Sequence, residues 1–195
     1  MVMEQNLSSN TRFLLNSELS KMGFAHVGAN VSIDRSAIFI GTNNISIGSN
    51  VRIDAFCLLA AASGDINIDE SVHIAASTRL FGGAGITVGR FSGISSGVSI
   101  FSQSDDYSGG YLANPLSPDG LRNVKSGRVE LMPYSLVGSN SVILPGVKIG
   151  KGASVGALTL VNKTVPDFSV VTGNPIRKIG VRNSEKILIH EGEQK

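Results

Sequence analysis

Aliphatic side chains return every six residues along much of this chain. The longest unbroken series is Leu131, Val137, Ile143, Ile149, Val155 and Val161. Mostly small side chains follow four positions after these residues, at Ser135, Ser141, Val147, Ala153 and Thr159. A period of six fits neither the alternation of a half-buried strand nor the 3.6-residue period of a helix. The series therefore predicts short strands separated by turns, with two inward positions in each hexad.

The same register runs through the first half of the chain in groups of three hexads. These groups are Val27, Ile33 and Phe39; Ile47, Ile53 and Leu59; Ile68, Ile74 and Leu80; and Val88, Ile94 and Ile100. Three strands per group predict a coil with three flat faces. Because one hexad cannot bury its apolar side alone, stacked coils must supply the core. The sequence thus predicts an all-β prism with a triangular cross-section. Asn30, Asn50 and Asn140 stand at turns, where a positive φ is tolerated.

The register slips after each third hexad, at residues 40–46, 60–67 and 81–87. These slips should share one edge of the prism. The largest interruption, residues 101–128, also follows a third hexad, so it predicts a long loop over that edge. Long loops in compact domains are usually functional. We therefore expect the functional site beside this loop.

The 195 residues form one domain with short extensions by this interpretation. Residues 1–26 form a helical extension, because residues 9–24 carry a rough apolar face. Residues 27–180 form the β-helix with its protruding loop, and residues 181–195 form a tail. The apolar residues 187–189 of this tail fit either a short helix or an edge strand.

Composition excludes several functions. A net charge of +2 without long charged runs gives no reason to expect nucleic acid. The longest apolar run, residues 55–62, is too short for a membrane span, and no signal-peptide pattern is present, so we expect a cytoplasmic protein. The three histidines are dispersed and Cys57 is alone, so no metal site is expected, and the three-histidine zinc site of γ-class carbonic anhydrases is excluded.

The hexads, the loop sequence SDDYSGGYLANP and the closing run VGSNSVILPGVKIGKGASVGALTLVNKTVPDFSVVTGNPIRKI resemble the hexapeptide-repeat acyltransferases. The match covers roughly residues 27–180 and is greatest to the sugar and antibiotic acetyltransferases. The resemblance implies a left-handed parallel β-helix and a homotrimer. It also implies that acetyl-CoA, as co-substrate, lies between the loop edge of one subunit and the later coils of the next. The DDYSG loop is similar to that of O-acetyltransferases of lipopolysaccharide and capsule biosynthesis.

The resemblance also assigns residues that bind the cofactor. Ser139 and Ala157 match positions that meet the pantetheine arm, and Asn162 and Lys163 match a polar pair of the family. The basic pair Arg177 and Lys178 matches positions that meet the nucleotide phosphates. A cofactor with phosphates and a long amide arm does need cations at one end.

The family's catalytic histidine is missing, and Asp105 stands in its place, followed by Asp106 and Tyr107 as substrate-binding candidates. Aspartate, with a reference pKa of about 3.9, is a weak base towards a hydroxyl. Two adjacent carboxylates could raise the pKa of one of them by repulsion and desolvation. Alternatively, the acceptor is an amine that needs no strong base, or catalysis has been lost.

Three functions follow from these alternatives. The first is acetyl transfer from acetyl-CoA to a sugar hydroxyl, and the second is N-acetylation of an amino sugar. The third is a non-catalytic trimeric scaffold. A scaffold has no need of Ser139, Ala157, Lys163 and Arg177 at their matched positions, so the sequence favours an enzyme. His73 precedes an inward residue and should point outward, where a neighbouring subunit could use it.

Overall fold

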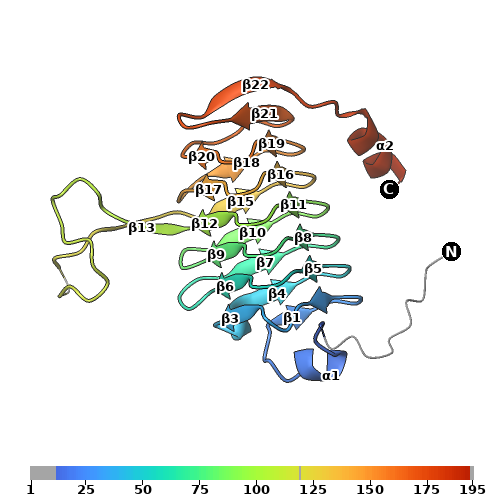
Figure 1. The fold of residues 1–195 in the computed structure, drawn as a ribbon, viewed down its shortest axis with the longest axis horizontal. Helices are drawn as coiled ribbons and strands as arrows, with labels where there is room; N and C mark the ends of the chain where they lie inside the picture. The colour runs from blue at the N-terminus through green and yellow to red at the C-terminus, as the bar shows by residue number, and fades with distance from the viewer. Residues whose placement is uncertain (1–11, 119, 194–195) are drawn as a thin grey trace.

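The computed structural model describes residues 12–118 and 120–193, and these form the predicted prism. Short parallel strands stack coil upon coil into three sheets, which we call the first, second and third face (Figure 1). The strands of the first face are, in order, β1 (His26–Val27), β4 (Ile45–Ile47), β7 (Ile66–Ile68), β10 (Ile86–Val88), β15 (Val129–Leu131) and β18 (Lys148–Ile149).

The second face ends in an antiparallel hairpin, and the third is wholly parallel. The second face contains β2 (Ser32–Ile33), β5 (Arg52–Ile53), β8 (His73–Ile74), β11 (Gly93–Ile94), β16 (Leu136–Val137), β19 (Ser154–Val155), β21 (Ser169–Thr172) and β22 (Arg177–Val181). The third contains β3 (Ile38–Ile40), β6 (Leu58–Ala60), β9 (Arg79–Phe81), β12 (Ser99–Phe101), β17 (Val142–Ile143) and β20 (Leu160–Val161).

The hexad residues line the interior as predicted. From the second coil onward these aliphatic residues are buried, whereas Val27 and Phe39 of the first coil are only partly buried. The first coil has no coil beneath it, and Phe39 instead packs edge-on against Phe24, with ring centroids 5.0 Å apart. The all-β prism predicted from the repeat is therefore confirmed, as is the left-handed parallel β-helix that the resemblance implied.

The faces meet at corners, where the backbone often adopts the left-handed conformation. Asn30, Asn50 and Asn140 have φ of 56°, 58° and 57°, as their residue type favours. Phe56 and Leu158 adopt the same conformation, with φ of 59° and 57°, although side chains of this size rarely do so. The regular stacking of the coils therefore fixes the left-handed turn conformation even at residues whose side chains disfavour it.

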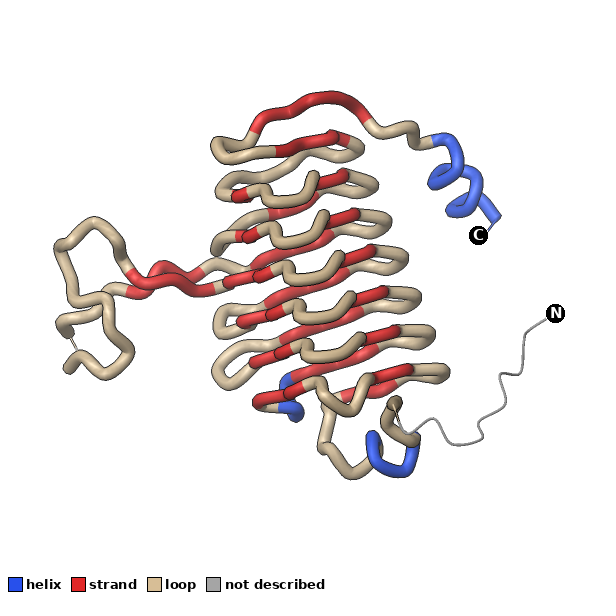
Figure 2. Tube along the Cα trace, in the orientation of Figure 1, coloured by secondary structure: helices blue, strands red, loops and turns tan. Residues whose placement is uncertain are grey.

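The register slips lie at one edge, as predicted. Between the third face and the next first face the chain inserts a 3₁₀ turn, η1 (Thr42–Asn44), then two further bulges, and finally residues 102–128. We call this edge the loop corner, and we call the edge between the second and third faces the 2–3 corner. The long insertion leaves the prism sideways at the loop corner (Figure 2).

The two ends of the chain carry short helices. Helix α1 (Asn16–Leu19) is much shorter than the helix expected within residues 9–24, because Phe13 and Leu14 are bound to the first coil. Phe13 bridges Asp34, and the Leu14 amide donates to the Ile33 carbonyl at 2.8 Å. The rest of the predicted extension, residues 1–11, lies outside the described residues.

Strand β22 ends at Val181, the first residue of the predicted tail, and the tail then forms helix α2 (Glu185–Glu193), so residues 187–189 lie in a helix and not in an edge strand. Ile187 is buried, and the Tyr134 hydroxyl lies 3.0 Å from His190 Nδ1. Neither helix of the described chain has the length and apolar character needed to cross a membrane.

Candidate active site

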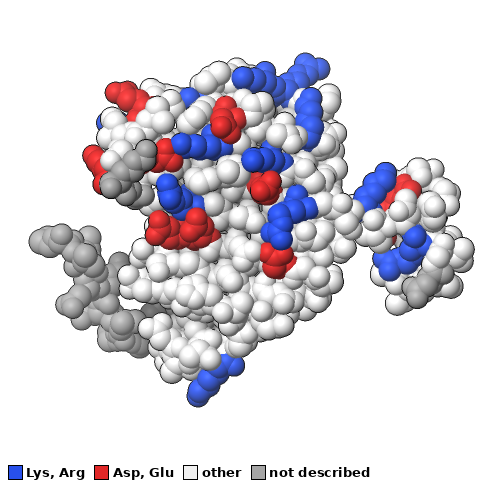
Figure 3. All heavy atoms as spheres, turned by 180° about the vertical axis from the view of Figure 1, so that it is seen from behind, with Lys and Arg blue, Asp and Glu red and all other residues white. Residues whose placement is uncertain are grey.

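The protruding loop begins and ends as a two-stranded ribbon, β13 (Gln103–Asp105) and β14 (Val124–Ser126). Asp105 pairs with Val124 at its outer end. Buried Ser102 anchors the base of the ribbon, since its hydroxyl donates to the Phe81 carbonyl at 2.9 Å and accepts the Ala84 amide at 2.8 Å. The loop stands clear of the prism and carries side chains of both charges (Figure 3).

The largest cavity described has a volume of about 710 Å³, against about 370 Å³ for a cavity elsewhere on the molecule, and it lies between this ribbon and the third face. It brings together three of the predicted residues: Asp105, Tyr107 and Asn162. The remaining lining includes the apolar side chains Phe101, Val142, Leu144, Pro145 and Leu160. We call it the loop cavity. One carboxylate over an apolar floor suits the positioning of an uncharged acyl group beside a proton acceptor.

Asp105 is half-buried at the edge of this cavity. Its Oδ1 lies 3.6 Å from an Nη of Arg122, which comes from the returning side of the loop. The contact leaves the carboxylate within the cavity lining. Tyr107 lines the same cavity with a residue exposure of 88%.

Asp106 is held differently from its neighbour. Its carboxylate is buried, accepts the Ser108 amide at 2.9 Å and the Asn123 side-chain amide at 3.0 Å, and lies 3.6 Å from Lys125 Nζ. The hydrogen bonds from Ser108, followed by the one from Asn123, lower its pKa to about 2. The expectation that adjacency raises the pKa of one carboxylate is therefore wrong for Asp106, whose oxygens are bound within the loop.

The predicted cofactor residues fall in three separate places. Ser139 and Ala157 stand at the 2–3 corner, and Asn162 and Lys163 at the loop corner. Arg177 and Lys178 lie on exposed β22 at the C-terminal end of the prism. A single chain does not bring these residues together.

A smaller cavity of about 320 Å³ lies on the second face and contains Ser139. Its polar lining is completed by His73, Ser95 and Ser96, and we call it the serine cavity. The hexad register predicts that His73 faces outward, which the structure confirms, but Ser95 and Ser96 do not stand out in the sequence. Their signal was weak, because a serine directly after a hexad strand is also an ordinary turn residue.

The histidine of this cavity is tied to a carboxylate. Its Nε2 lies 2.8 Å from Asp54 Oδ2, and Arg52 Nε donates to Asp54 Oδ1 at 2.8 Å. Burial of Asp54 opposes its ionisation, but the hydrogen bonds from His73 and Arg52 outweigh that effect and lower its pKa. Asp54 is thus a fixed anion beneath the imidazole.

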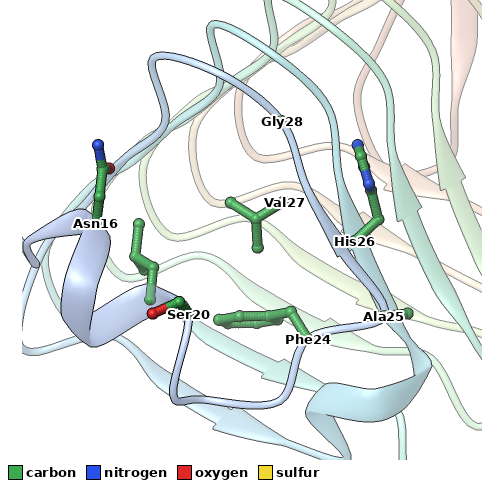
Figure 4. Close-up of a pocket in the computed structure, with 8 residues that line it drawn as sticks. Asn16, Ser20, Phe24, Ala25, His26, Val27 and Gly28 are labelled. Carbon is green, nitrogen blue, oxygen red and sulfur yellow. The ribbon is translucent and has the colours of Figure 1, made fainter.

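The 370 Å³ hollow lies between α1 and β1 at the N-terminal end of the prism (Figure 4). Phe24 and Val27 lie in it, and His26 stands on its β1 side (Figure 4). Among the residues that the structure describes, its lining includes no carboxylate, and it lies at the opposite end of the stack from β22. We therefore assign it no part in the chemistry. Among residues 12–118 and 120–193 there is no group of three potential metal ligands from His, Cys, Asp and Glu.

Comparison with known proteins identifies a left-handed β-helix with a cavity beneath a protruding loop as an architecture of acyl-transferring enzymes. The chain is 42% identical over 171 residues to dTDP-4-amino-4,6-dideoxy-D-glucose acyltransferase of Escherichia coli, covering 88% of each chain. It is 30% identical over 150 residues to the putative lipopolysaccharide biosynthesis O-acetyl transferase WbbJ of E. coli K12, covering 73% of this chain and 71% of that one. A scan against models of protein families finds no match.

Solved structures give the same result. AntD, an N-acyltransferase from Bacillus cereus in complex with dTDP and 3-hydroxybutyryl-CoA, superposes with a TM-score of 0.89 at 40% identity, covering 94% of this chain and 96% of that one. A variant of AntD in complex with dTDP-4-amino-4,6-dideoxyglucose and coenzyme A also gives 0.89, at 38% identity and 94% and 97% coverage. The chain belongs to the hexapeptide-repeat acyltransferase family, and it is a coenzyme A-dependent acyltransferase.

Proposed function

We propose that this protein transfers an acyl group from acyl-CoA to the amine of a nucleotide-linked amino sugar, such as dTDP-4-amino-4,6-dideoxyglucose. The main observation in support of this proposal is that Asp105 places a carboxylate in the loop cavity, at the position of the family's histidine. Similarity over most of the chain to an acyltransferase named for that sugar supports the same acceptor. We propose Asp105 as the catalytic residue and acetyl-CoA or a longer acyl-CoA as the donor.

The chemistry of an amine explains why a carboxylate suffices. The neutral amine attacks the thioester carbonyl, so a C–N bond forms and the nitrogen gains positive charge. A nitrogen in that state is far more acidic than a sugar hydroxyl, so Asp105 can accept its proton despite being a weak base. The C–S bond then breaks, and the proton passes to the departing thiolate. Holding amine and thioester together supplies much of the acceleration.

A hydroxyl acceptor is the second candidate, and the likeness to WbbJ favours it. A hydroxyl must lose its proton as it attacks, which calls for a base with a pKa nearer neutrality. Asp106 does not supply one, since its pKa of about 2 keeps it ionised and its oxygens are bound within the loop. We therefore rank the amine first.

We further propose that the protein acts as a homotrimer with sites shared between subunits. The loop cavity and the serine cavity lie on different faces of one prism, so they point in different directions. The AntD variants with solved structures alter a serine and an aspartate ten positions apart. In this chain Ser95 stands ten positions before Asp105, and the two residues line different cavities.

Exposed apolar residues support a contact between subunits along the 2–3 corner. Phe56 and Leu158 project there with exposures of 71% and 72%. Large apolar side chains gathered on one edge commonly mark an interface. If three prisms meet at this corner, the third face of one subunit turns towards the second face of the next. We include Ser139, Ala157, Asn162, Lys163, Arg177 and Lys178 in the proposal as residues that meet the cofactor across this contact.

Cytoplasmic location and a part in lipopolysaccharide synthesis complete the proposal. The first follows from the short apolar runs of the sequence, and the second is supported by the likeness to WbbJ. Tyr107 is the proposed acceptor contact on the loop, and Asp106 contributes indirectly, because its hydrogen bonds to Ser108 and Asn123 hold the loop conformation.

The test measures thiol release from acetyl-CoA and 3-hydroxybutyryl-CoA with two matched acceptors. These are dTDP-4-amino-4,6-dideoxyglucose and dTDP-6-deoxyglucose, which differ only in bearing an amine or a hydroxyl at C4. We expect turnover with the amine alone and an amide product by mass spectrometry. Turnover with the hydroxyl sugar alone would show that the enzyme is an O-acyltransferase instead. Failure to bind either CoA or acceptor would support the non-catalytic scaffold.

A further inference from the structure

The serine cavity exists because one position on the second face has no side chain. His73, Gly93 and Leu136 are successive partners on β8, β11 and β16, and all three side-chain positions point outward. A Cβ at Gly93 would lie 3.2 Å from Leu136 Cδ1, so the Leu136 side chain leans over the glycine. The result is a notch with the imidazole on one side, an aliphatic wall on the other, and serines along its edge.

The imidazole in this notch has one nitrogen engaged and one available. Because the Asp54 carboxylate can only accept, Nε2 of His73 carries the hydrogen and donates to it at 2.8 Å. In the neutral ring Nδ1 then presents a lone pair. Among the described residues Nδ1 of His73 has no hydrogen-bond partner, while the side chain is 52% exposed.

Asp54 is braced so that this arrangement is rigid. It is only 8% exposed, Arg52 Nε donates to it at 2.8 Å, and an Nη of Arg12 lies 3.6 Å away. The Asp54 carboxylate is therefore surrounded by two guanidinium groups and one imidazole, which hold it in one position. A histidine fixed by a buried carboxylate is a common way to hold an imidazole in one tautomer and orientation.

We propose that His73, fixed by Asp54, is a positioning residue for the amino sugar: its Nδ1 accepts a hydrogen bond from an N–H or O–H of the sugar, with Ser95 and Ser96 beside it. The inference rests on the proposed function. The notch, at about 320 Å³, has room for one hexose, and its hydroxyl and imidazole groups match a polyol. The aliphatic side of Leu136 offers a surface for the 6-deoxy methyl group of such a sugar.

The Asp105 that acts on this sugar belongs to a different copy of the chain. The serine cavity lies on the second face and the loop cavity on the third, so one chain cannot present both to a single sugar. A heterologous contact repeated around a threefold axis gives each site a loop from one subunit and a notch from the next.

The first experiment is kinetic, on the full-length protein with dTDP-4-amino-4,6-dideoxyglucose. We expect His73→Ala to raise KM for the sugar roughly tenfold, the effect of one lost hydrogen bond, with KM for acyl-CoA unchanged. His73→Gln keeps a side-chain oxygen acceptor and should recover part of the loss, and Asp54→Asn should resemble His73→Ala. His26→Gln, on the first face, is the matched control and should leave every constant unchanged.

The second experiment mixes subunits after co-expression of His73→Ala with Asp105→Asn. If the site is shared, random trimers contain about a quarter of fully wild-type sites, so activity at low sugar concentration exceeds the mean of the two parent proteins. If each chain uses its own His73 and Asp105, the mixture equals that mean.

The outcomes separate this inference from the proposed function. Absence of turnover by the wild type on the amino sugar contradicts the proposed function whatever the variants do. An active wild type combined with an unchanged sugar KM in His73→Ala overturns the inference alone. An equal rise in the KM values of sugar and acyl-CoA would also overturn it, because that pattern indicates a general structural defect.

Discussion

The first and third faces of the prism have the same interior and opposite exteriors. Outward positions of the first face are all polar: His26, Ser46, Asn67, Thr87, Glu130 and Lys148. Outward positions of the third face are mainly apolar: Ile38, Ile40, Leu58, Ala60, Phe81, Phe101, Val142, Leu144 and Leu160. Because the hexads inside are alike, the fold does not require this contrast. It indicates that the first face meets solvent and the third meets a partner or a ligand.

The local contacts of the two faces differ in the same sense. On the first face Arg128 donates to both Asp65 and Thr87 at 3.1 Å, so the polar side chains satisfy one another. On the third face the rings of Phe81 and Phe101 stack with centroids 4.9 Å apart, and Phe101 lines the loop cavity. The first face is complete within one chain, whereas the third leaves apolar surface uncovered.

The largest effect should come from the carboxylate over the third face. Asp105→Asn keeps the shape of the side chain but removes the proton acceptor, so kcat should fall by about 10² to 10⁴. Steady-state thiol release with saturating substrates measures it. Glu130→Gln makes the same chemical change on the first face and should leave kcat unaltered. An unchanged kcat in Asp105→Asn would mean that positioning alone drives the reaction.

The next effect should be on assembly. Leu58→Glu puts a carboxylate on the third face, where burial of an unpaired charge in a contact costs several kcal/mol. We expect the proposed trimer to dissociate, as followed by analytical ultracentrifugation at micromolar concentration. Ser46→Glu puts the same group on the first face of the same coil and should leave the trimer intact. If the two variants have the same molecular mass in solution, the third face is not the face that forms the contact between subunits.

A smaller effect should follow from breaking the ring stack. Phe101→Ala removes a stacking contact worth about 0.5 to 1.5 kcal/mol, as well as part of the floor of the loop cavity. For a chain of this size each kcal/mol shifts Tm by roughly 2 to 4 °C, so calorimetry should show a fall of a few degrees. KM for acyl-CoA should rise as well. Ser46→Ala, on the first face, should change neither quantity.

The smallest effect should be the loss of loop stability at acidic pH. The folded-state pKa of Asp106 is about 2, below the ordinary value of 3.8, so its contribution to loop stability is present above that ordinary value. The contribution is lost as pH falls from about 4 towards 2. The protection factor of the Ser108 amide, its exchange rate compared with that of an unfolded chain at the same pH, should therefore fall in that window, while amides of the first face stay protected. A fall that begins near neutral pH would contradict the assigned hydrogen bonds.

The sequence by itself determined the inside of the molecule. A six-residue period leaves one solution for burying Ile53, Ile74 and Ile94, which is to stack them in a prism. The slips after each third hexad fixed the loop corner, and the position of Asp105 relative to the hexads brought it to the cavity there. The stacking and the loop corner needed only local spacing, because each inward position repeats along the chain, whereas the choice of Asp105 came from the resemblance to the acyltransferase family.

Only the tertiary structure decided which outward side chains become neighbours. Coil lengths vary with the slips, so the contact of His73 with Asp54 and its shared cavity with Ser95 depend on the accumulated register. The loop likewise closes Asn123 onto Asp106 across seventeen residues, which lowers a pKa that adjacency alone was expected to raise. Periodicity specifies what points inward, whereas chemistry on the outside depends on distances that only the folded chain sets.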